Sequence, residues 1–178
     1  RKHVPVSEVA SQQDASVPSS QKLNTTDAKT ISPDSNFKLE TASRIKVLTD
    51  LYQIEIDTAG GDIRRLLLNN HLADNGQDKF LLLDDAQKPL LYVAQSGLIG
   101  NDLPTHKAIF ASAAPSYQMQ ADQNDVKVVM TWKNAEGVSV DKIYTFTRGS
   151  YAIKVDYKIT NGSAAALDPW VYYQIVHD

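Results

Sequence analysis

The 178-residue sequence contains no cysteine, which excludes disulfides, thiolate zinc sites and cysteine nucleophiles. No window approaches the roughly 18 apolar residues of a membrane helix, and the amino terminus lacks a signal-peptide core. Positive charge is sparse, since 18 Lys and Arg against 21 Asp and Glu leave a net charge of -3. The pair Arg64-Arg65, expected on a solvated strand face, is the nearest approach to a basic cluster. Nucleic-acid binding is therefore not predicted, and the chain is either cytoplasmic or part of a longer membrane or exported protein.

Aromatic residues and glycine are both absent from residues 1–36, which are instead rich in Ser, Thr, Gln, Asn and Asp. The few apolar residues there follow neither a helical nor a strand period. Such a segment buries too little surface to offset its ordering entropy, about 1–2 kcal/mol per residue. We therefore predict a disordered tether over residues 1–40 and a folded domain over residues 41–178.

The folded part is predicted to begin with two strands joined by a tight corner. Tyr52, Ile54 and Ile56 alternate with polar residues, which indicates a half-buried strand. Gly60-Gly61 permits the positive φ angles of a reversal. A returning strand follows over 62–69, and its side-chain phase slips near Arg64-Arg65, which indicates a β-bulge.

Similar short strands follow to the end of the chain, and no helical period of ten or more residues is present. The predicted strands are Lys79–Asp84, Leu90–Gln95, Val126–Trp132, Val138–Thr147, Tyr151–Thr160 and Trp170–Val176. Turn-forming residues such as Asn134–Gly137 and Asn161-Gly162 separate them. This pattern predicts an all-β, antiparallel, sandwich-like fold.

No residue pattern points to a reaction, a cofactor or a metal. The four histidines (His3, His71, His106 and His177) have turn or tail contexts and no metal-ligand spacing, so they are expected to be solvated. Ser96-Gly97 lacks the following helix of a nucleophile elbow. Asp84-Asp85 and the calcium-loop-like Asp74–Asp78 are both expected to be ordinary turns. Catalytic, cofactor-binding and metal residues are therefore predicted to be absent.

Three segments nevertheless resemble one protein family. The first is TDLYQIEIDTAGGDIRRLLL (49–68), the second YVAQSGLIG (92–100) and the third YTFTRGSYAI (144–153). In this order, behind a polar tether, they resemble the opening of the periplasmic domain of the YidC membrane protein insertase family. The resemblance covers roughly residues 45–176 and departs from the family in the 101–115 loop. Its motif residues are Gly60, Gly61, Asp62, Gln95, Ser96, Gly97, Arg148, Gly149 and Tyr151, which we expect to be structural positions.

The resemblance implies a galactose-mutarotase-like β-supersandwich, of which this chain would be the incomplete first portion. It further implies a non-catalytic periplasmic domain of an insertase and chaperone, on the periplasmic side of the inner membrane of Gram-negative bacteria. The implied partners are components of the Sec translocon and nascent membrane-protein clients, with a membrane tether outside this sequence. No residue of the insertase's membrane groove is matched here.

Two other functions stay open on the residues alone: a carbohydrate-active, mutarotase-like enzyme, and an exported sugar- or peptide-binding sandwich. The first would need an acid and a base across a sugar-sized cleft. The incomplete-domain reading makes a separate prediction. The last strand should lack neighbours, and Trp170, Tyr172 and Tyr173 should be under-buried.

Overall fold

A computed structural model describes residues 16–18, 39–86 and 91–177. The predicted tether, residues 1–40, lies almost wholly outside the described residues. The described part is built from eleven strands. They are β1 (Arg44–Leu48), β2 (Tyr52–Asp57), β3 (Asp62–Leu72), β4 (Lys79–Leu83), β5 (Tyr92–Ile99), β6 (Ala111–Ser112), β7 (Ser116–Gln118), β8 (Asp125–Lys133), β9 (Val138–Thr147), β10 (Ile153–Asn161) and β11 (Trp170–His177).

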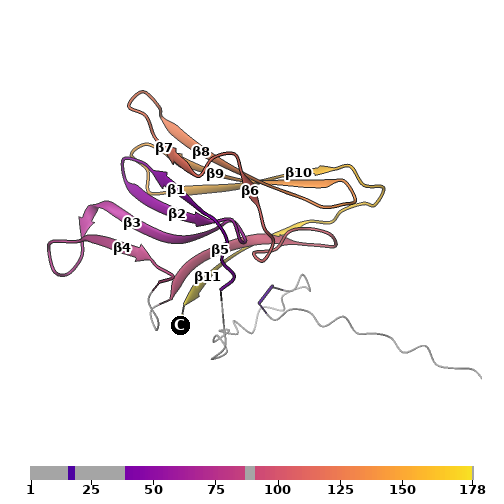
Figure 1. The fold of residues 1–178 in the computed structure, drawn as a ribbon, viewed down its shortest axis with the longest axis horizontal. Helices are drawn as coiled ribbons and strands as arrows, with labels where there is room; N and C mark the ends of the chain where they lie inside the picture. Colours follow the sequence, from indigo (N-terminus) through magenta and orange to yellow (C-terminus); the bar gives the residue numbers. More distant parts are fainter. Residues whose placement is uncertain (1–15, 19–38, 87–90, 178) are drawn as a thin grey trace, which may run out of the picture.

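The strands form two sheets that pack face to face (Figure 1). The seven-stranded sheet has the order β11-β5-β3-β2-β1-β7, with β4 paired to β3. The four-stranded sheet has the order β10-β9-β8-β6. Within the described residues there is no helix, and hence none with the length and apolarity needed to cross a bilayer. The all-β sandwich prediction is confirmed.

The core lies between the sheets and follows the period of two seen in the sequence. Tyr52, Ile54 and Ile56 of β2 are buried, while Gln53 and Glu55 between them are partly exposed. They pack in one cluster with inward residues of the second sheet, namely Val126, Val128, Met130, Tyr144 and Phe146. Burying the apolar faces of both sheets in this way is the main stabilising term of a sandwich.

One strand pairing and one strand boundary differ from what the sequence predicts. Strand β7 pairs with β1 in parallel, Val47 opposite Tyr117. The pairing joins only three residues of each strand, and the two strands are far apart in the sequence, so no local sequence pattern predicts it. The strand predicted from Tyr151 begins at Ile153, because residues 148–151 form the preceding corner.

The bulge predicted in the returning strand is present, but its consequence for the arginine pair is not the predicted one. Glu55 lies opposite Arg65, and the next residue, Ile56, lies opposite Ile63, so Arg64 is the extra residue. Arg65 stays half-buried on the outer face, whereas the side chain of Arg64 is only 1% exposed. The expectation of a solvated Arg64-Arg65 face is therefore wrong for Arg64, because a bulge re-aims one side chain.

One side of the sandwich is open, where β10 and β11 are the terminal strands of their sheets. Inward-facing β11 residues are half exposed there, including Tyr173 at 59% and Ile175 at 52%. Trp170 is exposed as well, but Tyr172 is only 7% exposed. The expectation that the last strand's aromatic residues are under-buried therefore fails for Tyr172, which packs under the 101–110 loop.

Candidate functional site: a buried polar hub and an outer hollow

The first two motifs meet around one buried lysine that sequence reasoning did not single out. Lys142 lies on β9, and its side chain is 0% exposed. Its Nζ donates 2.9 Å hydrogen bonds to the carbonyl oxygens of Gly60 and Ser96, which belong to different motifs. The same Nζ lies 3.7 Å from Oδ1 of Asp62. A side chain of the four-stranded sheet thus holds both motif segments of the seven-stranded sheet.

The carboxylate of Asp62 is the second centre of this arrangement. Gln95 Nε2 donates a 2.8 Å hydrogen bond to its Oδ2, and Gln174 of β11 in turn donates to Gln95 Oε1 at 2.9 Å. Arg64 Nη2 lies 3.6 Å from the same Oδ2. Tyr144, two residues after Lys142, donates to the carbonyl oxygen of Gly61 at 2.7 Å. We call this set the polar hub: Gly60, Gly61, Asp62, Arg64, Gln95, Ser96, Lys142 and Tyr144.

Burial controls the electrostatics of the hub, because water is excluded from both charges. Burial raises the pKa of Asp62 to about 6, opposed by the positive charges of Lys142 and Arg64. Burial likewise lowers the pKa of Lys142 to about 8, opposed by Asp62. The pKa of Tyr144 is raised, first by burial and then by the charge of Asp62. Each charge is thus tolerated mainly because the other is beside it.

Gly97, the last motif residue of β5, accommodates a tyrosine from β11. A Cβ at Gly97 would lie 2.7 Å from the hydroxyl oxygen of Tyr172. That oxygen accepts a 2.9 Å hydrogen bond from the backbone N–H of His106, and it lies 2.6 Å from His106 Nδ1. His106 is only 5% exposed. The expectation of a solvated loop histidine is wrong here, because the 101–110 loop folds back over β5 and β11.

The third motif lies apart from the hub and closes a different corner. Gly149 N donates a 2.7 Å hydrogen bond to Asp50 Oδ2, and Tyr52 OH donates to the carbonyl oxygen of Tyr151. The hydroxyl of Tyr151 lies 3.0 Å from His71 Nε2. Arg148 Nη2 donates to the carbonyl oxygen of Gln120 at 2.6 Å and its Nε to that of Gln123 at 3.0 Å. This corner joins the β9–β10 connection to the start of β2.

The chemistry available to the hub is limited by its enclosure. Asp62, Lys142 and Gln95 are buried and already bonded to one another or to backbone carbonyls. Across the described residues, no three His, Asp or Glu side chains are grouped so as to hold a metal ion. Lys142 could have been found from the sequence, because it occupies an inward position of the alternating strand VSVDKIYTFT. A lysine in phase with apolar residues indicates a buried charge with a partner.

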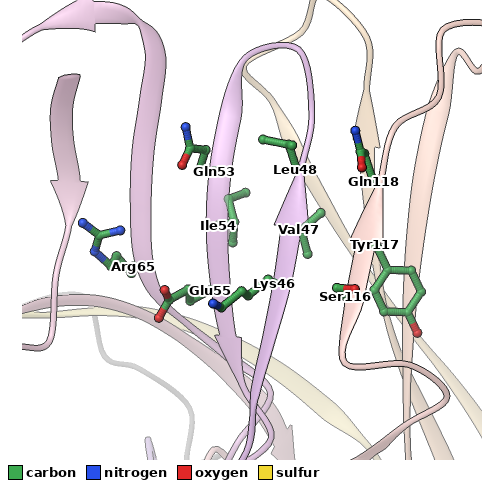
Figure 2. A pocket seen from close by; sticks show the side chains of 10 residues that line it. All are labelled: Lys46, Val47, Leu48, Gln53, Ile54, Glu55, Arg65, Ser116, Tyr117 and Gln118. Atoms are coloured by element: carbon green, nitrogen blue, oxygen red, sulfur yellow. The ribbon is translucent and has the colours of Figure 1, made fainter.

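An open hollow of about 380 Å³ lies on the outer face of the seven-stranded sheet (Figure 2). It extends across β1, β2, β3 and β7. Figure 2 shows Lys46, Glu55 and Arg65 as a row across three strands, in agreement with their pairing register. Glu55 lies 4.0 Å from Arg44, and Lys46 and Arg65 have no ion-pair partner in the described part of the chain. Charged side chains therefore lie beside apolar ones in the hollow, and two of its cations have no ion-pair partner among the described residues.

Comparison with known proteins identifies relatives of the whole folded part. The family model of the YidC periplasmic domain matches residues 44–178. The chain is 52% identical to the membrane protein insertase YidC of Methylobacillus flagellatus, over 93% of this chain and 31% of the relative. It is 42% identical to that of Nitrosospira multiformis (79% and 25%) and 44% identical to that of Laribacter hongkongensis (79% and 26%). The chain thus spans about a third to a quarter of the length of these relatives.

Proposed function

The chain belongs to the YidC periplasmic domain family, and from this premise we propose that it is the first portion of a non-catalytic domain of a membrane protein insertase. The domain lies on the periplasmic side of the bacterial inner membrane. Residues 41–178 form the β-sandwich portion, and residues 1–40 act as its tether to a membrane segment. The domain helps nascent membrane proteins to insert and fold, either alone or beside the Sec translocon.

The observation that carries this proposal is how the motif residues are used. Two of the motif residues, Asp62 and Ser96, carry groups that could do chemistry, and both face other side chains of the sandwich. Asp62 contacts Gln95 and Lys142, and Ser96 Oγ lies 2.9 Å from the hydroxyl of Tyr157. A general acid or base must reach the atom whose proton it moves. The burial of these groups supports a scaffold and not an enzyme.

The open side of the sandwich supports the view that this is an incomplete portion. Strands β10 and β11 offer free backbone donors and acceptors along the same side. Between them lie half-buried or exposed apolar side chains such as Val155, Val171 and Ile175. Free edges flanking apolar surface attract further strands. We expect later strands of the longer protein to pair there and to cover Tyr173.

We expect partner proteins to dock on surfaces that are not covered by the domain's own strands. Within this portion, we take the outer hollow as the candidate docking surface. A photo-crosslinking residue at Gln118, which is exposed at its rim, tests this in the full-length protein in membranes. We expect crosslinks to nascent membrane proteins or to Sec components. The matched position is Lys127, exposed on the four-stranded sheet, where we expect none.

The non-catalytic part of the proposal has its own test. The complete domain is incubated with an anomerically pure hexose, and epimerisation is followed by polarimetry. We expect the uncatalysed rate. A rate above it would favour a mutarotase-like enzyme, and an absence of crosslinked partners from every exposed position would remove the docking role.

A further inference from the structure

The residues immediately before β1 are ordered without being buried. Thr41, Ala42 and Ser43 are all exposed, and Glu40 before them is exposed too. Burial of apolar surface therefore does not offset the conformational entropy that is lost when this stretch is ordered. Its position must come from specific polar contacts, and each of these can be traced to a side chain near the Gly60-Gly61 corner.

Three side chains hold this stretch. Asp57 Oδ1 accepts a 2.9 Å hydrogen bond from Ala42 N, and Thr58 Oγ1 accepts one of 3.1 Å from Ser43 N. The backbone N–H of Thr58 donates back to the carbonyl oxygen of Ser43 at 2.9 Å. Arg64 Nη2 donates to the carbonyl oxygen of Glu40 at 2.9 Å. We call Asp57, Thr58 and Arg64 the junction clamp.

Arg64 is the most informative member, because within the described part of the chain its hydrogen bond goes to the stretch before β1 and not to the core. Asp62 already has Lys142 and Gln95 as partners, and Arg64 Nη2 lies 3.6 Å from its Oδ2 as a further contact. Within the described part of the chain, Arg64 Nε and Nη1 have no hydrogen-bond partner. Removing Arg64 would leave Asp62 with its partners Lys142 and Gln95, so no buried charge would lose its only partner. What Arg64 supplies uniquely is the hydrogen bond to Glu40.

Asp57 also connects the clamp to β1 itself. Arg44, the first residue of β1, forms an ion pair with Asp57 Oδ2 at 3.0 Å and a second with Asp85. Asp57 and Asp62 are cross-strand partners on either side of the corner, and both are fully buried. The stretch before β1 is thus attached to the same corner that Lys142 ties to the second sheet.

We propose that the junction clamp fixes the point and direction in which the N-terminal segment leaves the sandwich. Without the clamp, no hydrogen bond to Asp57, Thr58 or Arg64 would hold residues 40–43, and the chain could pivot at the start of β1. With the clamp formed, the pivot lies at or before Glu40, and the corner of the sandwich moves with it. The clamp is therefore a positioning device between the domain and whatever the N-terminal segment is joined to.

The test uses glutamyl endopeptidase on the full chain, because the bond after Glu40 is the one whose carbonyl Arg64 holds. The variants are Arg64→Met and, independently, Thr58→Val, which removes the hydroxyl acceptor at nearly constant volume. Arg65→Met is the matched control, since Arg65 is the neighbouring arginine, lies on the outer face opposite Glu55 and, in the described part of the chain, has no contact with residues 40–43. Cleavage after the exposed Glu136 serves as the internal reference, and cleavage after Glu55, inside β2, reports global unfolding.

We expect both clamp variants to accelerate cleavage after Glu40 about tenfold relative to Arg65→Met, because each loses one of the few bonds that oppose local opening. Cleavage after Glu136 and Glu55 should stay unchanged. Equal rates after Glu40 in the Arg65→Met and clamp variants would overturn the proposal. If Arg64→Met also accelerates cleavage after Glu55, that variant is globally destabilised, and the comparison of Thr58→Val with Arg65→Met tests the proposal instead. Equal cleavage rates after Glu40 in those two variants would then overturn it.

Discussion

The backbone N–H of Gly149 donates a 2.7 Å hydrogen bond to the carboxylate of Asp50, 99 residues earlier in the chain. Gly149 has φ of +72° in the corner between β9 and β10, and Asp50 precedes β2 in the other sheet. Thr49 accepts hydrogen bonds from Leu51 N and Tyr52 N, which fixes the turn that presents Asp50. The first and third motifs are therefore two halves of one contact between the sheets.

Removing this contact has a measurable cost. Asp50→Ala should lower the free energy of unfolding by about 1 kcal/mol, since an exposed hydrogen bond to a charged acceptor is lost. Asp74→Ala is the control, because Asp74 is an exposed aspartate in the β3–β4 turn. Urea denaturation measures both variants. Equal unfolding midpoints for the two would show that the Asp50–Gly149 bond contributes nothing.

Substitution by alanine should lower the free energy of unfolding by very different amounts at two of the motif glycines. At Gly149, a Cβ meets nothing within 4 Å, so Gly149→Ala faces only the strain of positive φ, about 1–2 kcal/mol. At Gly60, φ is +76° and a Cβ would lie 2.2 Å from the carbonyl oxygen of His106. Gly60→Ala should therefore cost about 3–5 kcal/mol, because strain and overpacking add. Similar losses in urea denaturation would contradict the close approach of the 101–110 loop.

The hub should make stability depend on pH in a defined way. The pKa of Asp62 is raised from 3.8 to about 6, so its contribution is largest below pH 3.8 and is lost as the pH rises through 6. The pKa of Lys142 is lowered from 10.5 to about 8, so stability returns as the pH rises from 8 toward 10.5. Relative to the Asp62→Asn, Lys142→Met double variant, the natural chain should be least stable between pH 6 and pH 8. Parallel stability curves for the two proteins, measured in urea from well below pH 6 to well above pH 8, would refute buried titration at the hub.

The sequence predicts the parts of this fold that depend on local periodicity. The alternation in β2 and β9, the Gly60-Gly61 corner and the bulge in β3 can all be read from neighbouring residues. The motif positions could also be found, but only through a family resemblance. Their geometry could not, since Gly60 and Ser96 meet only because Lys142, from a distant strand, lies between them.

Residues whose environment depends on long-range packing were the ones that sequence reasoning misplaced. From the sequence, Arg64 resembles a solvated strand arginine, but in the structure the bulge directs its side chain inward. From the sequence, His106 resembles a solvated loop histidine, but in the structure its loop lies over Tyr172. The three-residue pairing of β7 with β1 leaves no periodic signal at all. In each case the deciding contact joins elements far apart in the chain.

The central claim is that Lys142 braces the two sheets by holding the first two motifs, and one measurement tests it most directly. The free energy of unfolding of Lys142→Met is compared with that of the natural chain by urea denaturation at pH 7. We predict a loss of about 3–5 kcal/mol, because Asp62 and the carbonyls of Gly60 and Ser96 are left buried without their donor. A Lys142→Met variant that unfolds at the same urea concentration as the natural chain would contradict the account.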